Sequence, residues 1–262
     1  MARYAGQMAL EGWGRQAQEK LKSSRIFLAG AGGVAGAAAL HLLAAGLGAL
    51  RLVDDRRITL ADLSHPGLFR ERDLGKPKAV VAEARLKEVN PFALVEGQIK
   101  ALKEHNVFRL TSGYHLLLAA SDAPAATLLN LAAARFRLAL ICAGARETEG
   151  RLTTFWPGRG PCLACTGEKA SLSGKSSLML SSAPSPLSPS LSPSLPPSLP
   201  PSLGPLPGIV GALMALEAMR ILVGMGPGLL GRLLIFDARA FEFREEILRR
   251  RPRCPVCPEP AD

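Results

Sequence analysis

The chain has 262 residues, of which 48% are hydrophobic and 5% aromatic, so we expect a substantial core built from aliphatic side chains. Its formal net charge of +10 permits binding to nucleic acid or to acidic proteins. The basic residues are scattered, however, apart from a group at 249–253. This distribution favours a solvated basic face over a nucleic-acid groove, and no nucleic-acid partner is expected.

The N-terminal and apolar segments predict neither export nor a membrane span. Residues 1–16 lack an apolar stretch of signal-peptide length. The apolar segments 34–50 and 209–223 are shorter than the roughly 20 residues that a span requires, and both contain polar side chains. We therefore expect two buried helices, no membrane partner and a cytoplasmic protein.

The first elements in chain order are an N-terminal helix and a β-α-β unit. Apolar residues at helical spacing predict a helix within 1–23 that lies against the core. An apolar strand at 25–29 is followed by a glycine cluster at 30–36, an Ala/Leu-rich helix and a second strand at 50–53. The apolar positions of the N-terminal helix are Leu10, Trp13, Ala17 and Leu21.

The glycine cluster matches the dinucleotide-binding fingerprint, with alanine at its third small position. Gly30 permits a tight turn out of the strand, Gly32 lets the backbone approach phosphate oxygens, and Ala35 lets the helix pack on the sheet. The N-terminus of that helix offers N–H groups and a positive dipole end to a phosphate. Asp54, directly after the second strand, can accept hydrogen bonds from ribose hydroxyls. The pattern predicts nucleotide binding without specifying the nucleotide; a packing turn of small residues is the alternative.

The rest of the chain alternates between strands and helices. This alternation indicates an α/β fold, Rossmann-like, with a mostly parallel sheet covered by helices on both faces and with added antiparallel strands. We expect strands at 93–99, 115–120, 137–143, 151–156, 230–236 and 241–247, and helices at 75–89, 106–110, 127–136 and 208–224.

The composition changes to serine, proline and leucine between residues 169 and 208, with SPSL and PPSL tetrads at 188–203. Proline at this density excludes regular helix and sheet. We expect a flexible loop at about 170–207, inserted into a single domain that spans 1–262. A role as ligand for proline-binding modules has no further support in the sequence.

Four of the five cysteines form two CxxC pairs. Thiolates with this spacing chelate tetrahedral zinc, and four of them close the site, so we expect a structural zinc ion that clamps the middle of the chain to its C-terminus. A redox pair is the alternative. Cys142, within an apolar strand, is expected to be a small core residue. The zinc ligands would be Cys162, Cys165, Cys254 and Cys257.

Two charged residues suggest further contacts to a nucleotide. Asp122 follows the apolar strand at 115–120, and ligands bind along the carboxyl edge of such sheets. It could hold Mg²⁺, or it could cap the next helix. Lys78 lies at a helix start, where a cation opposes the dipole; it could contact phosphate or be an ordinary surface lysine.

Taken in their order, the motifs resemble those of a known family. The chain is similar to the HesA/MoeB/ThiF group of bacterial ubiquitin-activating-like adenylyltransferases, over nearly its whole length outside the proline-rich tract. The matching segments are Arg3-Tyr4, 17–21, the GAGGVAG turn, Leu52-Val53-Asp54, Gly75-Lys76-Pro77-Lys78, Asn90-Pro91, Asp122, 149–155, both cysteine pairs and 208–217.

The resemblance implies an activity. Members bind ATP and Mg²⁺ and adenylate the C-terminal glycine of a small ubiquitin-like sulfur-carrier protein, releasing pyrophosphate, in sulfur transfer of the thiamine or molybdopterin type. They are usually homodimers. By this resemblance Gly30, Gly32 and Gly33 form the phosphate turn, Asp54 binds ribose, Lys78 binds phosphate and Asp122 holds Mg²⁺. Asn130 matches an asparagine of the following helix, and the four cysteines match a structural zinc site.

The chain departs from the family pattern on its catalytic side. Gly6 stands where the family has an arginine finger, Arg56 replaces a second acid, and His65 aligns with a phosphate arginine. Ala123 replaces a common asparagine, and the proline-rich tract contains no cysteine for a thioester step.

Three hypotheses follow from these matches and departures. The first is an ATP-dependent adenylyltransferase acting on a sulfur carrier. The second is a catalytically impaired relative that binds nucleotide or a carrier protein, which the missing arginines favour. The third is an NAD-dependent oxidoreductase, suggested by the glycine fingerprint alone.

Overall fold

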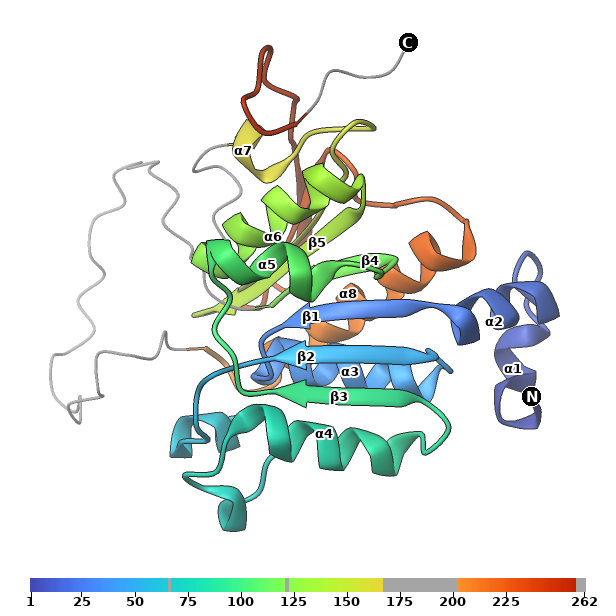
Figure 1. The fold of residues 1–262 in the computed structure, drawn as a ribbon, viewed down its shortest axis with the longest axis vertical. Helices are drawn as coiled ribbons and strands as arrows, with labels where there is room; N and C mark the ends of the chain where they lie inside the picture. The colour runs from blue at the N-terminus through green and yellow to red at the C-terminus, as the bar shows by residue number, and fades with distance from the viewer. Residues whose placement is uncertain (66, 121–122, 167–201, 258–262) are drawn as a thin grey trace, which may run out of the picture.

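An eight-stranded sheet runs through the molecule in the order β3-β2-β1-β4-β5-β6-β7-β8. Figure 1 labels its strands β1 to β5. The structure is a computed structural model that describes residues 1–262 except 66, 121–122, 167–201 and 258–262. The strands from β1 to β5 pair in parallel, and β6, β7 and β8 add antiparallel pairs. The strands are β1 Arg25–Ala29, β2 Ala49–Val53, β3 Leu94–Gln98, β4 Leu116–Ala119, β5 Ala139–Arg146, β6 Glu149–Phe155, β7 Arg232–Asp237 and β8 Glu242–Ile247.

Helices cover both faces of the sheet, as the sequence predicts. The side chains of β1 alternate: Ile26 and Leu28 join one core cluster with α3, α4 and α8, while Phe27 joins a second cluster with α5 and α6. Central parallel strands are buried on both faces and are therefore continuously apolar. The helices are α1 Ala5–Met8, α2 Gly14–Ser23, α3 Gly33–Ala44, α4 Lys78–Val89, α5 Glu104–Thr111, α6 Ala123–Phe136, α7 Leu163–Thr166 and α8 Leu206–Val223, with 3-10 turns η1 Ala2–Tyr4, η2 Leu60–Ser64 and η3 Glu71–Asp73.

The register of the parallel strands brings their carboxyl ends together at one edge of the sheet. Leu28 of β1 lies opposite Leu52 of β2 and Leu118 of β4. Because the strand order reverses around β1, the loops after β1, β2 and β4 separate there and leave a crevice. The glycine turn and Asp54 lie at this edge.

Helix α8 is long and apolar enough to cross a membrane by composition alone, yet half of it is buried within the molecule. It packs along α3, where Gly211 permits close contact: a Cβ at this position would lie 2.6 Å from the carbonyl oxygen of Val34. Glu217 is buried in α8 and accepts hydrogen bonds from the Thr154 hydroxyl at 2.7 Å and the Leu229 N–H at 2.9 Å. The expectation of a core helix at 208–224 is thus confirmed.

The helix expected within 1–23 is confirmed as α2, but it begins later than its apolar spacing suggests, because Leu10 and Trp13 precede it. The segment forms η1 and α1 in succession, and a turn then separates α1 from α2. Gly12 and Gly14 adopt φ values of +78° and +60° directly before and at the start of α2, a left-handed conformation that glycine adopts at little steric cost. Leu10 in this turn is exposed, while Ala17 and Leu21 pack in the core as expected. The loop expected at about 170–207 lies mostly outside the described residues.

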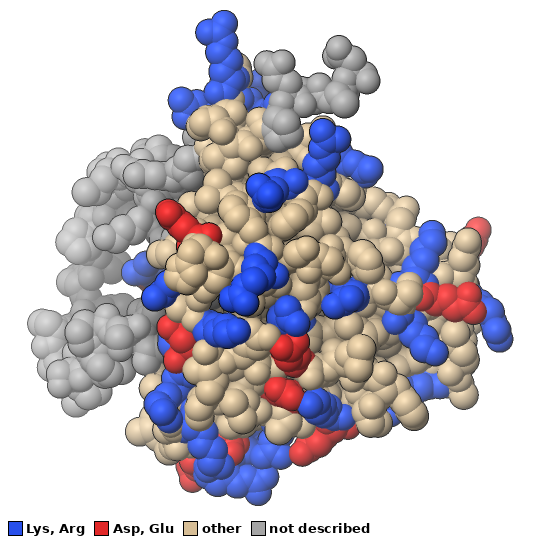
Figure 2. Space-filling model, in the orientation of Figure 1, with Lys and Arg blue, Asp and Glu red and all other residues tan. Residues whose placement is uncertain are grey.

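Charged residues on the face of Figure 2 are distributed rather than segregated. The Lys and Arg side chains spread over this face, with acidic side chains among them. This agrees with the scattered basic residues of the sequence.

Candidate functional site

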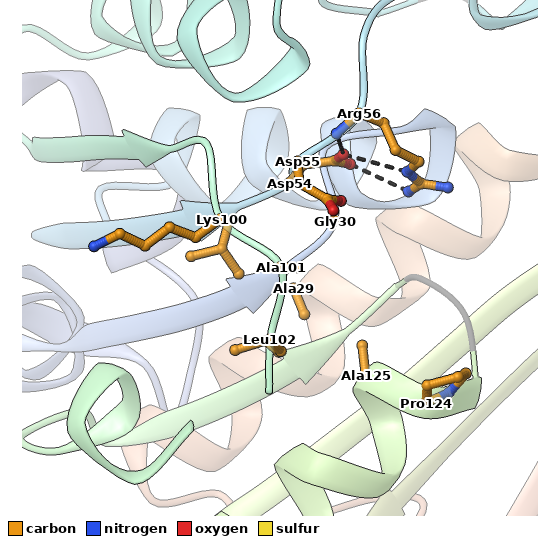
Figure 3. A pocket seen from close by; sticks show the side chains of 11 residues that line it. Ala29, Gly30, Asp54, Asp55, Arg56, Lys100, Ala101, Leu102, Pro124 and Ala125 are labelled. Carbon is orange, nitrogen blue, oxygen red and sulfur yellow. Dashed lines mark hydrogen bonds and ion pairs between the residues drawn. The ribbon is translucent and has the colours of Figure 1, made fainter. Parts of the chain in front are cut away.

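A cleft of about 150 Å³ lies at the carboxyl edge of the sheet, where β1, β2 and the start of α6 meet (Figure 3). Its walls come from segments far apart in the chain, as expected for a site at a topological switch point. The lining residues are Ala29, Gly30, Val53, Asp54, Asp55, Arg56, Lys100, Ala101, Leu102, Pro124 and Ala125.

The glycine turn connects β1 to α3 at one side of this cleft. Gly30 has a φ of +104°, which a residue with a Cβ rarely adopts. The space beside Gly32 is open, whereas a Cβ on Gly33 would lie 2.8 Å from Cβ of Pro207 and 3.0 Å from Cδ2 of His65. The turn therefore leaves the N-terminus of α3 accessible at Gly32 and packs tightly against its neighbours at Gly33.

Asp54 is buried at the end of β2, and donors of the chain itself occupy both of its oxygens. Oδ2 accepts from the Ala31 N–H at 2.9 Å and from Nη2 of Arg56 at 3.2 Å. Oδ1 accepts from the Arg56 N–H at 2.9 Å and from Nε of Arg56 at 3.2 Å. The structure thus places Asp54, the expected ribose acid, in the cleft. Asp54 is in contact with Arg56, which the sequence marks only as the replacement of a second acid.

Lys78 is buried at the start of α4 and forms an ion pair with Asp62, each side chain being 7% exposed. This excludes an ordinary surface lysine. Asp62 also accepts hydrogen bonds at 2.8 Å from the backbone N–H and from the hydroxyl of Thr59. Burial opposes ionisation of Asp62, but the hydrogen bonds from Lys78 and Thr59 outweigh it and hold the pKa of this carboxyl below its usual value.

The Asp62–Lys78 pair adjoins the glycine turn. Asp62 and His65 line a small hollow together with the α3 N-terminus at Gly32 and Gly33. Sequence reasoning missed Asp62 as a functional residue. The available signal was the acid three residues after Thr59, a spacing typical of a helix cap, but that pattern does not reveal a partner on α4.

Of two further residues expected near the nucleotide, Asp122 and Asn130, the structure describes only Asn130. Asp122 lies outside the described residues, so its contact with Mg²⁺ remains a prediction; the flanking Pro124 does line the cleft. Asn130 is buried on α6, and its side-chain oxygen accepts the N–H of Leu163 at 3.0 Å. Asn130 therefore connects α6 to the cysteine-bearing segment.

The four cysteines of the CxxC pairs meet in one cluster, as the sequence predicts. Their sulfur atoms all lie within 4.8 Å of one another, with Sγ–Sγ distances of 3.7 Å for Cys162–Cys165, 3.7 Å for Cys162–Cys254 and 3.5 Å for Cys165–Cys257. Sulfurs about 2.3 Å from a tetrahedral zinc ion would be separated by about 3.8 Å. All five cysteines of the chain are free thiols, so the donor set fits zinc in number and spacing.

The local environment affects the thiols of the cluster in opposite directions. Burial raises the pKa of Cys162 far above its ordinary value. Burial also opposes ionisation of Cys254, but the N–H groups of Cys257 and Val256 donate to its sulfur and lower its pKa to about 6. One thiolate forms readily, and a cation among the sulfurs would favour the others. Cys142 lies outside this cluster, fully buried in β5, which confirms it as a core residue.

Comparison with known proteins gives the same family over most of the chain. The model of the ThiF family matches residues 4–256. The sulfur carrier protein adenylyltransferase of Thermus thermophilus is 34% identical over 261 residues, which cover 97% of this chain and 90% of that protein. The adenylyltransferase and sulfurtransferase MOCS3 of Drosophila persimilis is 34% identical over 98% of this chain, which spans only 53% of that protein.

Solved structures agree on the fold. A crystal structure of E. coli MccB with succinimide superposes with a TM-score of 0.76 at 21% identity, over 93% of this chain and 69% of that one. A structure of PaaA gives a TM-score of 0.73 at 20% identity, over 94% of this chain and 73% of that one. At such identity these two show the fold alone. The family model and the Thermus relative establish that the chain belongs to the ThiF family.

Proposed function

We propose that the chain is an ATP-dependent adenylyltransferase that activates the C-terminal glycine of a small ubiquitin-like sulfur-carrier protein. The observation that supports this best is the family match across 4–256 together with the cleft at the switch point, which joins the glycine turn to Asp54. The Thermus relative of nearly equal length is, by its name, an adenylyltransferase for a sulfur carrier.

In this proposal each group of the cleft has one task. The N–H groups at the start of α3 and the cation of Lys78 hold phosphate oxygens. Asp54 accepts hydrogen bonds from the ribose, and Asp122 holds Mg²⁺. The carrier carboxylate forms a bond to the α-phosphorus of ATP, the bond to the leaving β-phosphate oxygen breaks, and pyrophosphate departs with Lys78 facing its negative charge. A Mg²⁺ ion held by Asp122 would supply further neutralisation of that charge.

The cysteine cluster has a structural role in the same proposal. A zinc ion held by Cys162, Cys165, Cys254 and Cys257 would have no open position for chemistry. It would fasten the C-terminal segment to α7, and through Asn130 to α6, which borders the cleft. A homodimer and a cytoplasmic location complete the proposal; the first rests on the resemblance, and the second fits a reaction that consumes ATP.

The impaired relative remains a second candidate because specific cations differ from the family pattern. Gly6 offers no side chain to a neighbouring site, and the guanidinium of Arg56 forms an ion pair with Asp54. In this case the cleft would bind nucleotide without forming an adenylate. Family membership leaves the NAD-dependent oxidoreductase without support.

ATP–pyrophosphate exchange separates the two candidates. The protein, loaded with zinc, is incubated with ATP, Mg²⁺, labelled pyrophosphate and each small ubiquitin-like protein of the host that ends in Gly-Gly. If the chain is an active adenylyltransferase, we expect ATP–pyrophosphate exchange that requires one carrier and is lost in Asp122→Ala. The impaired relative predicts nucleotide binding without exchange for every carrier.

A further inference from the structure

Arg56 and a bound ribose would compete for the same oxygens of Asp54. An ionised carboxylate has about four lone-pair sites, and the structure fills four with donors from Ala31 and Arg56. Two of these donors are backbone N–H groups, fixed by the path of the chain. The other two, Nε and Nη2 of Arg56, belong to a side chain that can move.

The contact between Arg56 and Asp54 is of a kind that a ligand can displace. The Asp54 side chain is 1% exposed, but that of Arg56 is 52% exposed. Ion pairs with one partner in water are weak, because solvent screens the attraction and solvates the released charge. Figure 3 shows the Arg56 side chain folded back onto Asp54 at the cleft, and Lys100 directed away from both.

The guanidinium also lies next to the place expected for phosphate. Oδ2 of Asp54 accepts simultaneously from Nη2 of Arg56 and from the N–H of Ala31, a residue of the glycine turn. A phosphate bound at the start of α3 would therefore lie beside a released guanidinium, which recognises phosphate well through its planar set of donors. An uncharged nucleoside offers no such new partner.

We propose that Arg56 makes ribose binding conditional on an anionic group in the same ligand, so that the cleft selects nucleotides over nucleosides. A nucleoside must displace the guanidinium from Asp54 and brings no anionic group to it. A nucleotide removes it and supplies a phosphate in exchange. This inference rests on the proposed nucleotide site and assigns to Arg56 the role of a specificity-determining residue.

Calorimetric titration of three proteins with three ligands tests the inference. The proteins are the wild type, Arg56→Ala and Arg57→Ala. Arg57 is a matched control because it has the same charge in the next position but donates to the carbonyl of Gly75 at 2.7 Å instead of to Asp54. The ligands are adenosine, 2′,3′-dideoxyadenosine, which lacks the competing hydroxyls, and ATP with Mg²⁺.

We expect Arg56→Ala to lower the Kd of adenosine by about fivefold, the upper end of a partly exposed ion pair. The Kd of ATP should stay the same or rise, because the phosphate loses a cation. Dideoxyadenosine should bind less tightly than adenosine to Arg56→Ala and should gain less from this substitution than adenosine gains. Arg57→Ala should leave the adenosine Kd unchanged.

The results that would contradict the role of Arg56 differ from those that would contradict the nucleotide site. An adenosine Kd that is unchanged or raised in a folded Arg56→Ala, while ATP still binds, overturns the inference alone. An equal gain in Arg57→Ala also overturns it, since the effect would then reflect overall charge. Absence of ATP binding to all three folded proteins overturns the nucleotide site, and the inference with it.

Discussion

The cysteine cluster gathers four groups that need the same partner, whereas the nucleotide cleft gathers acids and cations that already contact one another. In the cluster, sulfur atoms within 4.8 Å of each other favour more than one thiolate only if a cation joins them. In the cleft Asp54 contacts Arg56, and beside the adjoining glycine turn Asp62 contacts Lys78. In our proposal the stability of the first region depends on a bound metal, while a ligand of the second region must compete with contacts inside the protein.

The largest effect should come from removing one cysteine ligand. We expect Cys254→Ser to lose most of its bound zinc and to lower Tm by roughly 10 °C, because loss of a structural metal is among the most destabilising changes. Metal analysis and a thermal scan measure both. The control is Cys142→Ala, which removes a buried thiol outside the cluster and should keep one zinc per chain.

A redox role for the cysteines would give a different pattern. Freshly reduced wild-type protein would then contain little zinc, and Cys254→Ser would change Tm little. That result would remove the contrast between the two regions, since neither would depend on a bound ion.

The next effect concerns the buried Asp62–Lys78 pair beside the glycine turn. Lys78→Met should destabilise the protein by about 3 kcal/mol, because it leaves Asp62 buried without its cation. Lys76→Met is the matched control: Lys76 pairs with Asp73 but its side chain is 53% exposed, so the cost should stay below about 1 kcal/mol. Denaturant titration measures both values.

A double variant removes both charges of the Asp62–Lys78 pair. In Lys78→Met with Asp62→Leu no unpaired charge remains, so much of the lost stability should return. A double variant as unstable as the sum of the single changes would show that the two side chains do not stabilise each other.

Acid should weaken this pair in a defined pH range. The pKa of Asp62 is lowered in the folded protein, so its contribution is fully present above the usual value of 3.8 and is lost as pH falls through the lower folded value. The stability difference between wild type and Asp62→Asn should therefore be constant near neutral pH and shrink below about pH 4. A difference that grows on acidification would contradict the ion pair.

The smallest effect should appear where the two regions connect. Asn130→Ala removes the acceptor of the Leu163 N–H and should cost about 1–2 kcal/mol, the penalty of an unsatisfied donor. We expect a modest fall in zinc affinity, measured by competition with a chelator. Asn130→Asp keeps an acceptor in place and should retain most of the stability. Equal losses in both variants would argue against this hydrogen bond as the connection.

Much of the fold could be predicted because it depends on local patterns. The apolar run at 25–29, the glycine turn and the alternation of strands and helices predict the sheet, and two CxxC pairs predict the cysteine cluster even though their partners are 92 residues apart. The N-terminal helix begins later than predicted, because the spacing of apolar residues does not reveal that Gly12 and Gly14 adopt positive φ.

The contacts within the cleft could not be predicted from such patterns. Asp62 and Lys78 are 16 residues apart and meet only because η2 and α4 pack beside each other. The contact between Arg56 and Asp54 depends on one side-chain conformation, which the sequence leaves open. Asp122 lies outside the described residues, and its role stays a prediction.

The most direct test of the account is trapping of the activated carrier. The folded, zinc-loaded protein is incubated with ATP, Mg²⁺ and each small host protein that ends in Gly-Gly. The mixture is then quenched with hydroxylamine, and the mass of the carrier is measured by mass spectrometry. The account predicts that one carrier becomes a C-terminal hydroxamate, which requires a preceding acyl-adenylate, and that the product disappears without ATP. No hydroxamate on any carrier, from protein that still binds ATP, would contradict adenylyl transfer and favour the impaired relative.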